Sequence, residues 1–313
     1  MPEFYRHSGI VPVRGLVQTI FAGIGTAISL GIGYAYASVY IPFVYAHVLL
    51  TGVFGLVLGL LVKQAARAGC IRNRTVPGVI GILSGLVGLY FAWGGDLLAR
   101  KLLPPNAGFL VAFRPQVLWS YIQWAYENGL WELGKAANGP LTGLPLAAVW
   151  LTEAAFIVGL AAYFPWSEIR QWVFCEACGW WETIETNLCR YSAENAETIA
   201  ARIKDEDLSV LRELTIAKPE DQTFLRLSLA TCETCDESNY LDLERVTLKR
   251  DKKGNVKTIV EPLVGKMAIA AADVPLVKNA GQAPLEQSNA GEDAESAPSQ
   301  EGITDPATAS EGD

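Results

Sequence analysis

Two cysteine pairs carry the clearest chemistry in this sequence. Cys175 and Cys178 lie in the segment CEAC, Cys232 and Cys235 lie in CETC, and two residues separate the thiols of each pair. Four thiolates at this paired spacing are typical of a tetrahedral structural zinc site. We therefore predict that these four cysteines bind one zinc ion as a structural cofactor.

Thiol redox chemistry and the packing of reduced thiols are the alternatives for these cysteines. A redox motif is expected singly, at the start of a helix beside a βαβ pattern, whereas here two pairs lie beside turn-like or strand-like segments. The 53 residues between Cys178 and Cys232 exceed the roughly 15–20 of a compact four-cysteine module, so an insertion must separate the pairs. Cys189 would be a competing ligand or a core residue, and Cys70 receives no role.

Three ionisable residues form a second candidate set because they fall within apolar segments. Glu153 lies in WLTEAA, His47 follows the start of an apolar run, and Asp96 lies near the end of another. Charge at lipid depth costs roughly 2.5–3.5 kcal/mol on insertion scales, so each of these residues needs an explanation. One explanation is a polar or proton-handling site of a small transporter. The other is a neutral, hydrogen-bonded Glu153 that only fixes helix register.

Four mostly apolar segments of the length of a bilayer span contain or flank these ionisable residues. The predicted spans are 15–39, 41–62, 75–98 and 145–164, the last closed by Pro165. Residues 115–133 are rich in Trp and Tyr and are predicted to form an extracytoplasmic interfacial helix, with a soluble cap on the bundle as the alternative. Residues 1–165 are thus expected to form a four-helix transmembrane domain.

Small residues recur at four-residue spacing in these spans. They include Gly23, Ala27, Gly31 and Ala35 in the first span and Ala155 and Gly159 in the last. Helices in lipid associate by close backbone packing through such stripes. We expect a compact bundle, and the same stripes would equally serve a contact between copies in a homo-oligomer.

The polar chain after Pro165 is predicted to form a small α+β, zinc-ribbon-like domain over residues 166–265. A helical insert is expected at 192–215, with a break near Lys204 to Asp207 that splits it in two, and FLRLSLA, YLDLERVTLKR and VKTIVEPL are expected to be strands. Residues 266–313 are predicted to be a disordered acidic tail. The stretch 271–313 carries nine acidic residues and one Lys, which accounts for the whole net charge of −8.

Basic residues near the span ends predict the orientation of the chain. They are Arg6 and Arg14 before the first span, and Lys63, Arg67, Arg72 and Arg74 between the second and third. The positive-inside rule places both termini in the cytoplasm, although Arg100 and Lys101 at the far end of the third span count against it. The cysteines would then lie on the reducing side, which favours metal-bound thiolates over disulfides.

The acidic neighbours of the cysteine pairs, among them Glu176, Glu182, Glu233 and Asp236, make a poor surface for phosphate. Nucleic acid is therefore not an expected partner. The expected partners are the lipid bilayer and a protein that binds the cytoplasmic domain.

Several whole segments together resemble a group of uncharacterised bacterial multi-pass membrane proteins that carry cysteine-pair motifs in a C-terminal cytoplasmic region. They are EFYRHSGIVPVRG, YIPFVYAHVLLTGVFGLVLGLLV, LWSYIQWAYENGLWELG, AVWLTEA and FCEACGWW. The resemblance implies a location in the bacterial inner membrane, and it brings no assigned activity or catalytic residue.

No nucleophile–base set, phosphate loop or HExxH motif is found in the sequence. We therefore expect a non-enzymatic scaffold or interaction protein with a structural zinc. A small transporter that uses Glu153 and His47 is the alternative, and a membrane enzyme that acts on lipid is a third class with no supporting motif.

Overall fold

The computed structural model describes residues 2–41, 44–104, 106, 108–130, 140–169, 171–218, 220–235, 237–251 and 255–280, without the side chains of residues 44, 45, 187 and 189. The chain forms two compact units. The first contains Glu3–Ile184 and Ala230–Tyr240, and the second contains Glu185–Leu229 and the chain from Leu241 onward.

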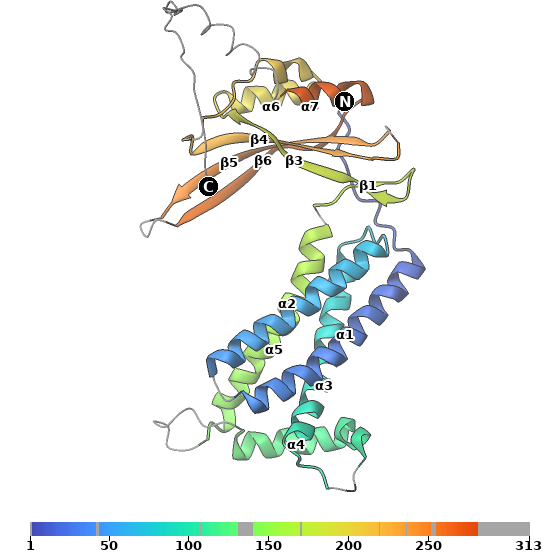
Figure 1. Cartoon of the computed structure of the whole chain (residues 1–313), viewed down its shortest axis with the longest axis vertical. Coiled ribbons are helices and arrows are strands. Elements are labelled where there is room, and N and C mark those ends of the chain that lie inside the picture. The colour runs from blue at the N-terminus through green and yellow to red at the C-terminus, as the bar shows by residue number, and fades with distance from the viewer. Residues whose placement is uncertain are drawn as a thin grey trace, which may run out of the picture. The chain divides into compact units, whose positions relative to one another are not determined.

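Four long helices and one shorter helix make up most of the first unit (Figure 1). The long helices are α1 (Val13–Tyr40), α2 (Val44–Ala68), α3 (Thr75–Ala99) and α5 (Gly143–Ile169). They lie side by side, with α1 against α3, α2 against α5, and α3 also against α5. The 3₁₀ turn η1 (Phe109–Phe113) and helix α4 (Pro115–Asn128) lie at one end of this bundle.

Glycine allows the helix backbones to approach closely. A Cβ atom at Gly31 would lie 2.3 Å from the carbonyl oxygen of Gly88, and one at Gly81 would lie 2.2 Å from that of Ala161. The predicted stripe of α1 is confirmed, because its small residues are the buried residues of that helix. The small residues of the last span do not serve the bundle: Ala155 and Gly159 are exposed, α5 instead buries larger residues such as Ile157, and a contact of this stripe with another copy stays a prediction.

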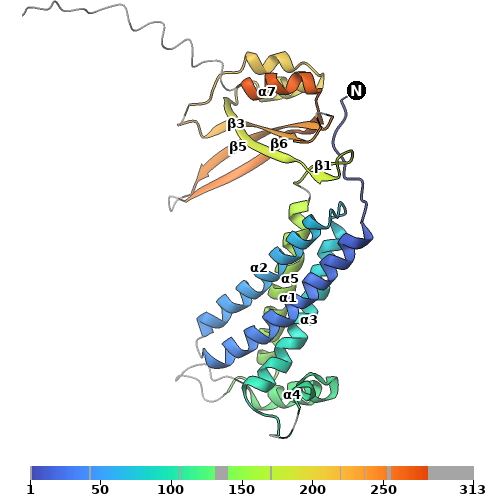
Figure 2. The same ribbon diagram turned by 45° about the vertical axis from the view of Figure 1, so that its right-hand side comes forward.

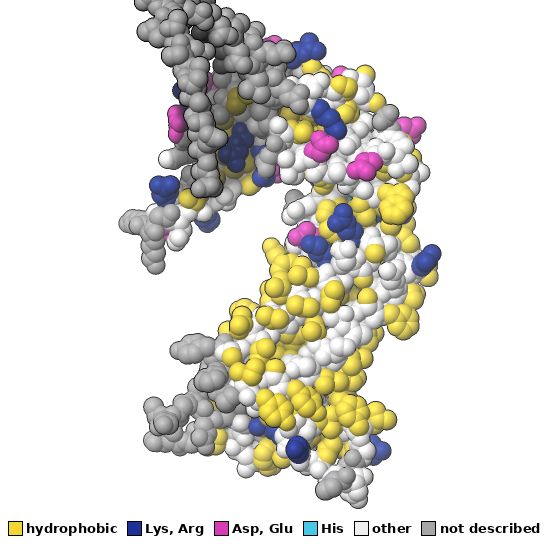
Figure 3. Space-filling view, in the orientation of Figure 1, with side chains coloured by type: hydrophobic (Ala, Val, Ile, Leu, Met, Phe, Trp, Pro, Cys, Tyr) yellow, Lys and Arg dark blue, Asp and Glu magenta, His cyan; other side chains and the backbone are white. Residues whose placement is uncertain are grey.

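The outer surface of the bundle is apolar. Large exposed hydrophobic side chains include Phe21, Val48, Leu83, Leu151 and Phe156. Figure 3 shows these apolar surfaces over the helices, with Lys and Arg side chains near both ends of the bundle. All four long helices have the length and composition needed to cross a membrane, which indicates a membrane protein.

Several helix ends differ from the sequence predictions. Helix α2 continues to Ala68, six residues beyond the predicted end at 62. The prediction followed apolar residues alone, and the last turns of the helix are more polar. Helix α5 continues through Pro165 to Ile169, which packs in a cluster with Ala66 and Ile71. Helix α4 ends at Asn128 because Gly129 adopts a positive φ of 76°, and the remainder of the predicted 115–133 helix reaches beyond the described residues.

A four-stranded sheet in the order β3-β4-β5-β6 dominates the rest of the chain. Its strands are β3 (Thr183–Ser192), β4 (Thr223–Thr231), β5 (Asn239–Arg250) and β6 (Val256–Ala268). Helices α6 (Ala196–Lys204) and α7 (Val274–Asn279) cover one face of it (Figures 1 and 2). Alternate residues of β4 and β5, such as Leu225, Leu227 and Leu241, point to that face and form its core.

Three predictions for this region need correction. The insert expected to be helical over 192–215 is split at the predicted break, with α6 ending at Lys204 and Glu206 at a positive φ of 66°, but its second half contains only the 3₁₀ turn η2 (Leu208–Arg212). Strand β3 was not predicted. Residues 266–280, assigned by composition to the disordered tail, complete β6 and form α7, whose Val277 is fully buried. Residues 281–313 lie outside the described residues.

Candidate functional sites

Two short hairpin tips bring the four predicted cysteines together. Strand β1 (Phe174–Cys175) pairs antiparallel with β2 (Trp180–Trp181), and Gly179 at the turn has a φ of 73° and donates its N–H to the Cys175 carbonyl at 2.9 Å. The second tip joins β4 to β5, and is closed by the Cys232 N–H donating to the Ser238 carbonyl at 3.2 Å. We call these tips the first and second knuckles.

The four sulfur atoms of Cys175, Cys178, Cys232 and Cys235, here called the cysteine cluster, all lie within 4.8 Å of one another. The Sγ atoms of Cys175 and Cys235, one from each knuckle, are 3.5 Å apart. Tetrahedral coordination at a metal–sulfur distance of about 2.3 Å places sulfurs about 3.8 Å apart. The cluster is therefore compatible with one tetrahedral metal ion.

The surroundings of the cluster shift the pKa values of its thiols in different directions. Burial raises the pKa of the Cys175 thiol. Burial also opposes ionisation of Cys232, but hydrogen bonds from the backbone amides of Thr234 and Cys235 outweigh it and lower the Cys232 pKa to about 7. Amides that converge on a sulfur are the feature that makes a knuckle turn a good thiolate site.

Acidic residues beside the cysteines hold the knuckles in place. The Thr183 hydroxyl donates to Glu233 Oε1 at 2.7 Å, which links the two knuckles, and the Ser238 hydroxyl donates to the buried Glu182. Glu176 forms an ion pair with Arg72. The sequence alone indicated only an acidic surface here. In the structure these carboxylates form hydrogen bonds or an ion pair with other residues of the chain.

The first knuckle packs on the last turn of α2 and on the loop between α2 and α3. Trp181 donates its indole N–H to the Arg67 carbonyl at 2.8 Å, and the Arg72 guanidinium lies 4.4 Å from the centre of the Phe174 ring. From the N-terminal segment, Tyr5 accepts the Phe174 N–H at 3.0 Å. We call this end of the bundle the knuckle end.

These contacts explain why the first compact unit does not end at residue 165, where the sequence predicted a domain boundary. The knuckles belong to the same unit as the helices, and most residues of the four-stranded sheet belong to the other unit. Cys70 lies in the same loop with a positive φ of 51°, and only a weak contact of 3.9 Å joins its sulfur to the Gly179 carbonyl. The side chain of Cys189 is not among those described.

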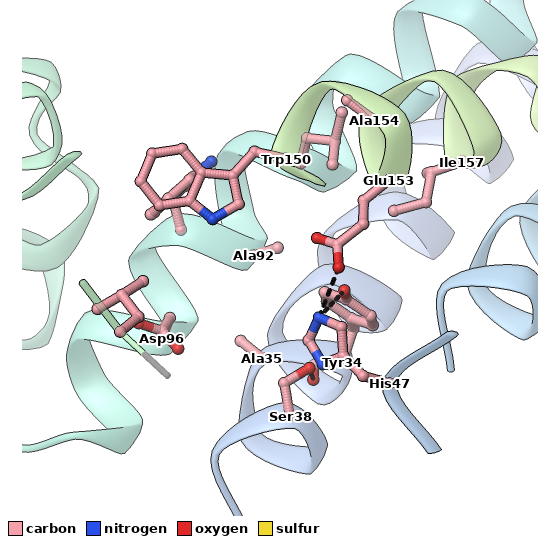
Figure 4. A pocket seen from close by; sticks show the side chains of 13 residues that line it. Tyr34, Ala35, Ser38, His47, Ala92, Asp96, Trp150, Glu153, Ala154 and Ile157 are labelled. Carbon is pink, nitrogen blue, oxygen red and sulfur yellow. Dashed lines mark hydrogen bonds and ion pairs between the residues drawn. The ribbon is translucent and has the colours of Figure 1, made fainter. Parts of the chain in front are cut away.

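A second group of polar side chains converges inside the bundle, at the end nearer α4. His47 Nε2 lies 2.9 Å from Glu153 Oε1, which joins α2 to α5 (Figure 4). The Tyr34 hydroxyl of α1 lies 3.0 Å from the same His47 nitrogen and 3.2 Å from Thr51 Oγ1. Three helices are thereby tied together by one polar network.

The donors in this network follow from its geometry. Thr51 donates its hydroxyl proton to the His47 carbonyl at 2.9 Å, so its oxygen is left to accept from Tyr34. A carboxylate can only accept, so with Glu153 ionised His47 Nε2 carries the proton that it donates to Oε1. Both side chains are partly exposed, at 14% for His47 and 20% for Glu153.

Asp96 borders the same space but has other partners. Arg100 donates from Nε to Asp96 Oδ2 at 2.9 Å, and the Tyr121 hydroxyl of α4 donates to the same oxygen. Burial and the nearby Asp96 charge raise the pKa of Tyr121, so its hydroxyl stays protonated and able to donate. Asp96 therefore fastens α4 to α3.

These groups line a cavity of about 120 Å³, which we call the polar cavity. Its polar and aromatic lining consists of Tyr34, Ser38, His47, Trp93, Asp96, Trp150 and Glu153. Of the three residues predicted to form an intramembrane site, Glu153 and His47 are in contact and Asp96 lies across the cavity. Sequence reasoning missed Tyr34, Thr51, Trp93 and Trp150, because a Tyr, Thr or Trp in an apolar helix carries no signal of its own.

Comparison with known proteins finds no matching family model, no similar curated protein and no similar solved structure. The function must therefore be argued from the two sites.

Proposed function

We propose that this protein is a non-enzymatic, multi-pass protein of a bacterial inner membrane. In this proposal a zinc ion clamps the two knuckles at the end of the helix bundle, and the sheet that continues from them is an interaction domain for a protein partner. The observation that carries the proposal is the convergence of four cysteine sulfurs within 4.8 Å, from segments 53 residues apart in the sequence.

The residues at the cluster fit zinc. Two knuckle turns supply all four ligands, and the backbone amides at Cys232 favour thiolate. The basic loop with Arg67 and Arg72 lies at the same end of the bundle, and the positive-inside rule puts that end in the reducing cytoplasm. When bound, the ion would fix the knuckle geometry, and it is given no role in catalysis.

The interaction role has a separate basis in the sheet. Strand β6 is an edge strand, and Val256, Ile259 and Val260 on it are 54%, 39% and 41% exposed. An open strand edge with apolar side chains is a common site for protein contact.

Metal analysis of the purified full-length protein tests the clamp. We expect one zinc per chain, and Cys175→Ser or Cys235→Ser should remove it. Cys70→Ser is the matched control, because Cys70 lies in the neighbouring loop but outside the cluster, and it should retain the full zinc content. A wild-type chain purified without metal under reducing conditions, and unable to take up zinc, would refute the clamp.

A photo-crosslinker placed at Ile259 in living cells tests the interaction role. We expect one defined crosslinked product that persists in Cys70→Ser and is lost in Cys175→Ser. A product unaffected by loss of the metal would separate partner binding from the clamp.

The alternative of a small transporter is favoured by one observation, the contact between His47 and Glu153 beside the polar cavity. Flux in proteoliposomes that is abolished by Glu153→Gln but kept by Cys175→Ser would favour it over the scaffold.

A further inference from the structure

We propose that the polar cavity binds a small organic cation, an ammonium group with one- or two-carbon substituents. The inference concerns binding and is independent of both the zinc clamp and any transport. It depends on the size of the cavity, its charge and its aromatic walls.

The size of the cavity limits the ligand. Its volume is about 120 Å³. An engineered cavity of about 150 Å³ holds benzene, which has six non-hydrogen atoms, so about five such atoms fit here. Tetramethylammonium and short alkylammonium ions have this size.

The charges at the cavity favour a cation. Two carboxylates line it, Glu153 and Asp96, and each is engaged through only one oxygen among the described residues. Arg100 balances Asp96 but is not part of the lining. The described residues that line the cavity thus include two carboxylates and no Lys or Arg side chain, which favours a positively charged ligand.

The walls add aromatic faces and edges. The rings of Trp93 and Trp150 lie 4.9 Å apart at nearly a right angle, and the Tyr34 ring borders the opposite side beside His47. Figure 4 shows the Glu153 carboxylate pointing into the space between Trp150 and Tyr34. A carboxylate framed by aromatic rings is the combination that recognises alkylammonium groups, since the ring faces attract cations and the ligand is desolvated there.

Two sources would supply this chemistry: a free amine from the aqueous phase, or the ammonium headgroup of a zwitterionic lipid. The cavity lies at the end of the bundle nearer α4, where Trp119 and Trp124 are exposed. Aromatic side chains of this kind favour the headgroup layer, so both sources can reach it.

Ligand-observed NMR on the purified full-length protein in detergent tests the inference. Saturation transfer to the methyl groups of tetramethylammonium should be saturable, with a Kd of roughly 1 mM for a ligand of this size. tert-Butanol, a neutral molecule of the same shape and size, should give at least a tenfold weaker response. An equal response to both compounds, or none to tetramethylammonium, would overturn the proposal without any variant.

Glu153→Gln tests the residue that carries the charge. The amide keeps the size of the side chain and its hydrogen bond to His47, and we expect at least a tenfold weaker affinity for tetramethylammonium. Glu168→Gln is the control, because Glu168 lies on the same helix but pairs with Lys63 at the knuckle end. Unchanged affinity in a folded Glu153→Gln protein would also overturn the proposal.

Reconstitution in nanodiscs distinguishes the two sources. If a lipid headgroup occupies the cavity, phosphatidylethanolamine should weaken tetramethylammonium binding severalfold relative to phosphatidylglycerol. If the ligand is a free amine, the affinity should be the same in both lipids. Either result supports a cation site, and loss of binding in both lipids would refute it.

Discussion

The cysteine cluster and the polar cavity both gather polar side chains from distant segments, but they satisfy them in different ways. In the cavity, each acidic group has a partner from the chain itself: His47 for Glu153, and Arg100 with Tyr121 for Asp96. In the cluster, the sulfurs mainly face each other. Four thiolates so close together repel one another unless a cation lies between them.

This difference indicates where each region obtains its stability. The cavity depends on helix packing and should form without any added ion. In the proposed function, the cluster instead depends on a metal ion that the chain itself does not supply. Treatments that remove metal and treatments that disturb helix packing should therefore affect the two regions separately.

Metal removal should give the largest effect. Structural zinc contributes about 10–16 kcal/mol in small modules, so chelation should unfold the knuckles. In hydrogen-exchange mass spectrometry we expect peptides that contain Cys175 and Cys232 to lose protection while peptides of α3 stay unchanged. Cys70→Ser should match the wild type before and after chelation. Equal loss of protection in α3 would show that the two regions are not independent.

Disturbing helix packing should give the reverse pattern. A Cβ atom at Gly31 meets the Gly88 backbone at 2.3 Å, so Gly31→Ala must push α1 away from α3, at a cost of about 1–3 kcal/mol. The measurement is thermal unfolding in detergent, with zinc content as a second readout that should not change. Gly25→Ala is the control, because a Cβ atom there meets nothing within 4 Å. A stability equal to that of the control would contradict the close approach of these helices.

Asp242 on β5 extends the comparison to a carboxylate that forms no ion pair with the described residues. Burial, followed by the nearby Glu244, raises its pKa to about 6, and its buried Oδ1 has no hydrogen-bond partner in the part of the chain that the structure describes. The folded state then binds the proton more tightly than the unfolded state. Its contribution to stability is full below about pH 4, falls as the pH rises to about 6, and is lost above that.

Asp242→Asn should therefore stabilise the protein near pH 7.5, by at most about 3 kcal/mol, and flatten the pH dependence between 4 and 6. Hydrogen exchange of β5 at pH 5 and pH 7.5 measures both effects. Glu194→Gln, at an exposed position outside the strands, serves as a control for the loss of one negative charge. Lower stability of Asp242→Asn at pH 7.5 would mean that the ionised carboxylate has a stabilising role.

The smallest expected effect concerns the attachment of α4. Asp96→Asn weakens the hydrogen bonds from Arg100 and Tyr121 by removing the charge that assists them, at a cost of about 1 kcal/mol. Amide exchange in α4 should quicken severalfold while exchange in the knuckles is unchanged. Glu127→Gln, on the exposed face of α4, should leave the exchange rates as they are. Equal rates in both variants would show that apolar contacts alone hold α4.

The sequence predicted the elements whose signals are local. Apolar length revealed the four membrane helices, small residues every fourth position revealed the packing face of α1, and paired cysteines revealed the candidate metal site. Predictions from composition were wrong where tertiary packing orders a segment of tail-like composition. Residues 266–280 look like the acidic tail that follows them, but Met267 and Val277 are buried in the core of the sheet. On α5, Ala155 and Gly159 do not serve the bundle, because they are exposed and a Cβ atom at Gly159 would meet nothing within 4 Å among the described residues.

By itself, the sequence determined the chemistry available at each site, because it specifies the side chains and their short-range spacing. It contains four thiols in two turns, and a Glu and a His inside apolar helices. The tertiary structure alone decided which groups meet. It placed Tyr34 and Thr51 beside His47, paired Asp96 with Tyr121 instead of His47, and packed the first knuckle on the end of α2 and the loop that follows it. Contacts between such distant segments depend on how whole helices and strands pack, and no local pattern encodes that.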